Sequence, residues 1–206
     1  ARYDWLGYIP GDELPHFVNP PEGRFVTANN KTVPDDYPHI LSRSWDAPYR
    51  HDRIDNLLAA ISAHDVNSFQ KIQLDILDTY AATLRLHLVA SGPFEGLAAE
   101  AARLVGDWDG TMARDRPEPL IFAAWARALS RRIYADELGN AFQDHWGFNE
   151  DFVLRVLDNE EGQSRWCDDR TTPESEDCAI QVSLALDDAI SELSEAHGTE
   201  PGAWRW

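Results

Sequence analysis

Apolar residues three or four positions apart predict two successive helices in the middle of the chain. The first covers residues 49–64 and the second covers residues 65–90, with Asp65 or Asn67 as the N-cap of the second. The apolar positions that form one face are Ile54, Leu57, Leu58 and Ile61 in the first helix and Phe69, Ile72, Ile76, Tyr80 and Leu84 in the second. Gly92–Pro93 then interrupts the pattern.

The same spacing predicts further helices toward the C-terminus, at residues 94–108, 117–139, 151–158 and 178–196. The helix at 117–139 begins at prolines and ends at Gly139, which is the usual arrangement of these two residue types at helix ends. In the last helix we expect Leu184, Leu186, Ile190 and Leu193 to face inward.

Residues 1–48 lack such periodicity and are rich in Pro, Gly and aromatic residues, with one short strand candidate at Arg24–Ala28. The predicted fold class is therefore mainly α, with an irregular or short-strand lead before the helices. We expect two domains, namely a lead-in at 1–48 that carries an Asn-Asn turn and a helical domain at 49–206.

The charge and apolar content of the chain disfavour several classes of partner. The chain has 36 acidic and 18 basic residues and a formal charge of −18, and its longest basic cluster is Arg131–Arg132. Such a chain repels phosphate, which disfavours nucleic acids and anionic membranes as partners. No apolar run approaches the roughly 18 residues that a membrane span requires. An apolar content of 43% is enough for a core.

The only two cysteines, Cys167 and Cys178, flank the loop in "WCDDRTTPESEDC". They can close a disulfide, which would stabilise the fold by roughly 3 kcal/mol and would place the protein outside the cytosol. The alternative is two free thiols. A zinc site is disfavoured because there is no further Cys and no nearby His at ligand spacing.

Common catalytic motifs are missing, including G-x-G-x-x-G, the Walker loop, G-x-S-x-G and H-E-x-x-H. His51 and Asp52 are adjacent in sequence, as are His64 and Asp65. Adjacent side chains on a helix do not face each other, so the spacing makes neither pair a catalytic dyad. Asp35–Asp36 is typical of a solvated turn. The tryptophans expected as core or interface anchors are Trp45, Trp108, Trp125, Trp146 and Trp166.

Asn29 and Asn30 follow the strand candidate directly, in "RFVTANNKTVPDDYP". Asn favours turns because it tolerates left-handed backbone and bonds its own main chain. A side-chain amide can also donate a hydrogen bond to a developing oxyanion. Residue chemistry alone favours the turn.

Several segments, taken in order, resemble the large chain of the penicillin acylase family. They are "DWLGYIPGDELPHFVNPPEGRFVTANNKTVPDDYP", "SWDAPYRHDRIDNLL", "IQLDILDTYAATL", "WDGTM" and "RWCDDRTTPESEDC". The resemblance implies an amidase of the N-terminal-nucleophile class, with an αββα fold, made from an exported precursor that cleaves itself. The nucleophile of the family is the serine at the start of the large chain. Ala1 is not a serine, so we expect these residues to be an internal excerpt without a nucleophile, inactive alone.

By this resemblance Asn29 is the oxyanion-hole residue, and Arg50 supports catalysis, with Arg53 as the fallback if the register shifts. Asn30 is expected to shape the turn. A calcium site known in part of the family uses an aspartate where this chain has Leu41, and Asp35 and Asp36 do not replace it. No metal or other cofactor is therefore expected.

The prediction is an exported amidase, periplasmic or extracellular, that acts on a small-molecule amide. Its partners would be the remainder of the same precursor, namely the small chain and the N-terminal part of the large chain. The alternative is a non-catalytic helical binding or interaction module that keeps the family architecture.

Overall fold

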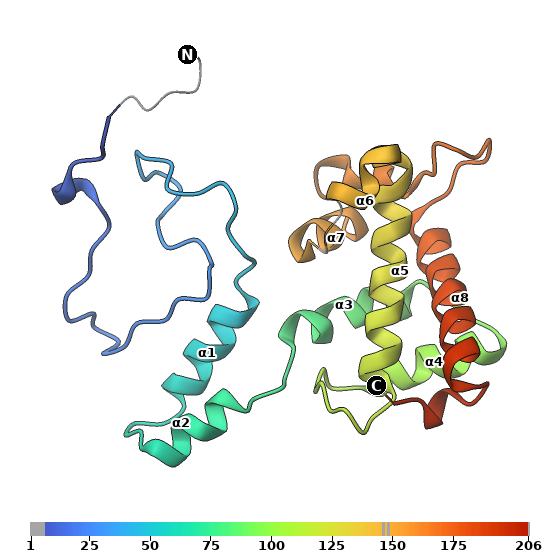
Figure 1. The fold of residues 1–206 in the computed structure, drawn as a ribbon, viewed down its shortest axis with the longest axis horizontal. Helices are drawn as coiled ribbons and strands as arrows, with labels where there is room; N and C mark the ends of the chain where they lie inside the picture. The colour runs from blue at the N-terminus through green and yellow to red at the C-terminus, as the bar shows by residue number, and fades with distance from the viewer. Residues whose placement is uncertain (1–6, 146, 148, 206) are drawn as a thin grey trace. The chain divides into compact units, whose positions relative to one another are not determined.

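The computed structural model describes residues 7–145, 147 and 149–205. In this part of the chain, helices and irregular segments are accompanied by two isolated β-bridges and no strand. The predicted mainly α class is confirmed. The chain divides into two compact units, Ala1–Gln73 and Leu74–Trp206, which are described separately (Figure 1). Ala1 and Trp146 lie outside the described residues, and the predicted domain boundary between residues 48 and 49 stays a prediction.

The first unit is mostly extended up to the helices α1 (Tyr49–Ala59) and α2 (Val66–Gln73), with one 3-10 turn, η1 (Gly11–Glu13). Among its described residues only Ala28 and Asn30 are buried. The strand expected at Arg24–Ala28 does not form, because the pairing there is limited to a single parallel bridge between Asn30 and Asp46.

Asp65 is confirmed as a helix cap, whereas Asn67 lies inside α2. The Asp65 carboxylate accepts a hydrogen bond from the Ser68 amide at 2.7 Å, and the Ser68 hydroxyl accepts one from the Asp65 amide at 2.9 Å. Before it, α1 ends earlier than expected, at Ala59. The His64 ring then lies 2.9 Å from the Leu58 carbonyl, close enough to hydrogen-bond one of the carbonyls left open at the end of α1.

The predicted helix at 65–90 is wrong in its middle, because α2 ends at Gln73 and α3 (Thr79–Ala90) begins a new helix. The intervening residues pair with a distant turn, since Leu77 bridges Thr111 and the Met112 amide donates to the Ile76 carbonyl at 2.8 Å. Asp78 then caps α3 by accepting from the Ala81 amide.

The second unit packs α5 (Glu118–Leu138) along α8 (Cys178–His197), with α4 (Gly96–Asp107) against both and α3 against α4 (Figure 1). The remaining elements are η2 (Gly139–Ala141), α6 (Phe142–His145), α7 (Glu150–Leu157), η3 (Glu160–Cys167) and η4 (Pro201–Ala203). The Trp125 indole donates to the Val182 carbonyl at 2.8 Å and so joins α5 to α8 inside the core.

Trp108 and Trp125 are fully buried, as expected, and Trp204 joins them without having been predicted. Trp45 and Trp166 are half-buried. In α8, Leu186, Ile190 and Leu193 face inward, but Leu184 is 38% exposed. Leu184 lies two positions before Leu186, which is more than half a turn around the helix.

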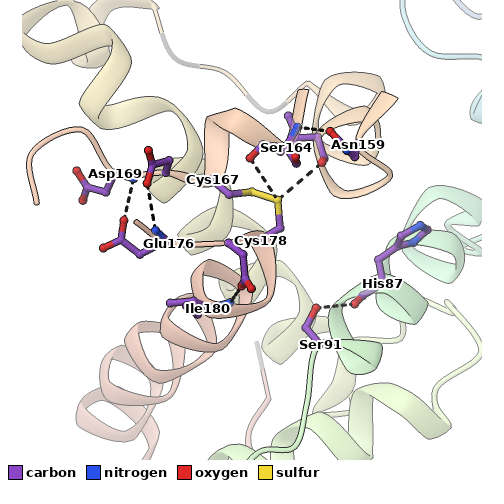
Figure 2. The surroundings of a disulfide bond; sticks show 12 residues. His87, Ser91, Asn159, Ser164, Cys167, Asp169, Glu176, Cys178 and Ile180 are labelled. Atoms are coloured by element: carbon purple, nitrogen blue, oxygen red, sulfur yellow. Dashed lines mark hydrogen bonds between the residues drawn. A yellow bond between two sulfur atoms is a disulfide. The ribbon is translucent and has the colours of Figure 1, made fainter. Parts of the chain in front are cut away.

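The disulfide between Cys167 and Cys178 is present, and it joins the last residue of η3 to the first residue of α8 (Figure 2). The alternative of two free thiols is excluded. Inside the loop that the disulfide closes, the Asp169 amide donates to the Glu176 carboxylate at 3.0 Å, and the Glu176 amide donates to the Asp168 carboxylate at 3.1 Å. Among the described helices, none is long and apolar enough to cross a membrane.

Candidate functional site

The two adjacent asparagines of the first unit have different environments. Asn30 is buried and bonds its own turn, because its Oδ1 accepts from the Ala28 amide at 3.1 Å and its Nδ2 donates to the Lys31 carbonyl at 3.2 Å. Its side chain therefore shapes the turn. Asn29 is exposed and has a φ of 64°, in the left-handed region that Asn tolerates better than most residues.

Asn29 is held at two points. Its carbonyl accepts from the Asp46 amide at 2.9 Å, and its Oδ1 accepts from Arg50 Nη2 at 2.9 Å. A guanidinium only donates hydrogen bonds, so the Asn29 atom that faces Arg50 must be the oxygen. The amide nitrogen consequently faces away from Arg50, and among the described residues Nδ2 has no hydrogen-bond partner. An N–H donor is thus presented outward.

Arg50 is the second residue of α1 and reaches back to the asparagine turn. In addition to Asn29 Oδ1, its Nη2 lies 2.8 Å from the Ala28 carbonyl and 2.7 Å from Asp46 Oδ2. The hydrogen bond to Asn29 Oδ1 comes from Arg50, and the choice between Arg50 and Arg53 as the supporting residue stays a prediction. The positive charge lies beside an amide that donates, an arrangement suited to an anion or a polarised carbonyl oxygen.

A second arginine ties the segment before the turn to α1. Arg24 donates from Nε to Asp55 Oδ1 at 2.6 Å and from Nη2 to Asp55 Oδ2 at 2.8 Å. These hydrogen bonds and the positive charge lower the pKa of the Asp55 carboxyl below its ordinary value. Two-point arginine–carboxylate pairs fix geometry as well as charge. The pair therefore holds residues 24–30 against the helix that carries Arg50.

The sequence interpretation did not single out Asp46, Arg24 or Asp55. Asp46 and Asp55 both fall inside the segment "SWDAPYRHDRIDNLL", so their place in a recognised motif was the available signal. Arg24 also lies inside a recognised segment, but nothing in that segment identifies its partner, which is 31 positions away.

No group of three or more potential metal ligands lies together within the described residues. Asp35 pairs instead with Lys31, whose hydrogen bond and charge lower the pKa of the Asp35 carboxyl. The chemistry that this site offers is hydrogen-bond donation from a neutral amide next to a fixed guanidinium.

Comparison with known proteins matches all of residues 1–206 to the family described as penicillin amidase. The penicillin acylase 2 proenzyme of Pseudomonas sp. (strain SE83) is 37% identical over 137 residues, which are 66% of this chain and 18% of that protein. The acyl-homoserine lactone acylase QuiP of Pseudomonas fluorescens (strain Pf0-1) is 30% identical over 227 residues, covering 100% of this chain and 28% of that protein.

A solved structure of the thermostable penicillin G acylase from Alcaligenes faecalis is similar to 98% of this chain, with a TM-score of 0.68. The match covers 41% of that chain at 18% identity, which establishes similarity of fold alone. The present chain spans less than a third of the length of the curated relatives that it matches.

Proposed function

Because the chain belongs to the penicillin amidase family, we propose that the protein that contains it is an amidase in which Asn29 stabilises the oxyanion of acyl transfer. Arg50 orients the Asn29 amide and adds a positive charge beside it. The relatives are named as acylases of penicillins and of acyl-homoserine lactones, which supports an N-acyl amide as the substrate class.

One observation carries the assignment of Asn29, namely its contrast with Asn30. Both residues are in the same turn, but only Asn30 uses its amide nitrogen to bond the local main chain. The Asn30 amide is therefore committed to the turn. The Asn29 oxygen is instead bonded to Arg50, and the two N–H donors of Asn29 are left for a ligand.

The reaction that follows from the family resemblance begins with attack by an N-terminal serine, whose α-amine acts as the base. The Oγ–acyl bond forms and the C–N bond of the amide breaks through a tetrahedral oxyanion, and water then hydrolyses the acyl-enzyme. Asn29 Nδ2 donates to this oxyanion in both steps. No residue of the present sequence is assigned as the nucleophile, so the 206 residues alone are expected to be inactive.

The same resemblance supports an exported protein, periplasmic or extracellular, whose remaining precursor segments complete the site. The disulfide between Cys167 and Cys178 agrees with this location, because disulfides persist in oxidising compartments.

The decisive variant is Asn29→Gly in the protein expressed from its complete reading frame. Glycine adopts a positive φ without strain, so only the amide is removed. We expect kcat for benzylpenicillin or a long-chain N-acyl-homoserine lactone to fall about 10²–10³-fold, as for other oxyanion donors. Asn19→Gly is the matched control, because Asn19 is also exposed and has a φ of 51°. Full activity of Asn29→Gly would return Asn29 to a turn-forming role.

A helical binding module is the second candidate, favoured by apolar side chains that are exposed in the first unit. Val66 is 75% exposed and Phe17 is 67% exposed. Sequencing the N-terminus of the largest chain in the mature protein separates the candidates. A large chain that begins with serine supports the amidase, whereas a single uncleaved chain supports the binding module.

A further inference from the structure

Asp46 contacts the asparagine turn by two routes. Its backbone amide donates to the Asn29 carbonyl at 2.9 Å. Its Oδ2 accepts from Arg50 Nη2 at 2.7 Å, and the same nitrogen lies 2.9 Å from Asn29 Oδ1. One residue therefore holds the main chain of Asn29 directly and its side chain through Arg50.

We propose that Asp46 is a positioning residue that keeps Asn29 Nδ2 turned outward toward the substrate. The proposal rests on the function proposed above for Asn29. Arg50 Nη2 has only two hydrogens but faces three oxygens, those of Ala28, Asn29 and Asp46. The ionised carboxylate is the strongest of the three acceptors, so it fixes the plane of the guanidinium. The orientation of that plane determines where the N–H that meets Asn29 points.

The Asn29 amide needs this support because rotation about its last side-chain bond has a broad, nearly two-fold profile. A half-turn would exchange Nδ2 and Oδ1 and would present an acceptor to the oxyanion. With Arg50 in place, that half-turn would set two donors against each other. The Arg50 side chain is itself 61% exposed, so without Asp46 the guanidinium would keep only the neutral acceptors of Ala28 and Asn29.

An ordinary structural role explains Asp46 less well. It lies just before α1, where an aspartate often caps a helix. The N-cap of α1 is Pro48, however, and no side chain caps this helix. An exposed pair of this kind, with Asp46 at 56% exposure, also adds little to stability. The backbone amide of Asp46 instead contacts Asn29, and its carboxylate contacts the arginine that bonds Asn29 Oδ1.

The test uses the protein from its complete reading frame and compares Asp46→Ala, Asp46→Asn, Asn29→Gly and the double variant Asp46→Ala with Asn29→Gly. We expect Asp46→Ala to lower kcat about 10-fold, with an unchanged KM, because misplaced catalytic groups cost up to about 10²-fold. Asp46→Asn keeps an acceptor without the charge and should lose about 3-fold, since such bonds are roughly half as strong. Asp52→Ala is the control, because Asp52 is an exposed neighbour that contacts His51.

A double variant no slower than Asn29→Gly alone is the expected result, because Asp46 then acts only through the amide. The positioning role would be overturned if the kcat losses of the two single variants multiplied in the double variant. It would also be overturned if Asp46→Ala had a normal kcat while Asn29→Gly was impaired. Either result would leave the proposed function standing. Normal kcat in Asn29→Gly would remove both. If Asp46→Ala does not fold, an Asp46→Asn kcat equal to that of the parent overturns the proposal.

Discussion

Replacement of Gly110 by alanine should destabilise the second unit substantially. Gly110 has a φ of +91°, which an L-residue adopts only at a cost. A Cβ at this position would lie 2.9 Å from the Asp78 carbonyl oxygen and 2.9 Å from the Ala82 Cβ. Neither atom can give way alone, because both belong to the start of α3 or its cap. The Gly110 carbonyl also accepts from the Asp78 amide at 3.0 Å, which holds the two segments together.

The magnitude has two parts. The positive φ costs roughly 1–2 kcal/mol for a residue with a Cβ. Forcing an extra carbon into packed atoms typically costs about 1–3 kcal/mol. The expected loss of unfolding free energy is therefore about 2–5 kcal/mol for Gly110→Ala. Gly162→Ala separates the two parts, because Gly162 has a φ of +76° and, in the part of the chain that the structure describes, its added Cβ would have no heavy atom beyond its neighbours in the chain within 4 Å.

Urea denaturation followed by far-UV circular dichroism measures both variants against the parent protein. Gly110→Ala should lose at least 1 kcal/mol more than Gly162→Ala, which corresponds to the packing cost alone. Equal losses in the two variants would refute the reasoning, because the close approach of the Gly110 turn to α3 would then carry no energetic cost.

Two further variants test the second unit. Replacing both Cys167 and Cys178 with alanine opens a loop with a sequence separation of 11, so the unfolding free energy should fall by about 3 kcal/mol, and an unchanged urea midpoint would contradict this. Burial alone would raise the pKa of Glu118, but hydrogen bonds from Arg116 and from its own backbone outweigh it and lower the pKa below the ordinary 4.5. Its stabilising contribution should therefore be present above pH 4.5 and be lost as the pH falls through the lowered pKa. The melting temperature of Glu118→Gln should lie below that of the parent at pH 7 and approach it at low pH, and a constant difference would argue against this linkage.

Local sequence was sufficient where a helix depends on residues within one or two turns. The 3.6-residue pattern located α4, α5 and α8 closely, and Gly139 marked the end of α5. Asp65 was identifiable as a cap because its partner, Ser68, is three positions away. These features rest on hydrogen bonds and burial that repeat along a single helix.

The break between α2 and α3 was not predictable in this way. The apolar spacing runs continuously through residues 65–90, whereas the interruption comes from pairing of residues 76–78 with the turn at 110–112. Periodicity contains no information about a partner more than 30 positions away. A continuous pattern therefore predicted one helix where the tertiary structure forms two.

For the site, the sequence by itself determined that an Asn-Asn pair occupies a turn, and its motifs indicated the family and pointed to Asn29 and Arg50. Only the tertiary structure decided that Asn29 Oδ1 faces Arg50 while Asn30 bonds its own turn. It also brought in Asp46 and the pair of Arg24 with Asp55. The reason is physical, since the direction in which a side-chain amide donates is set by neighbours that folding brings together from separate segments of the chain.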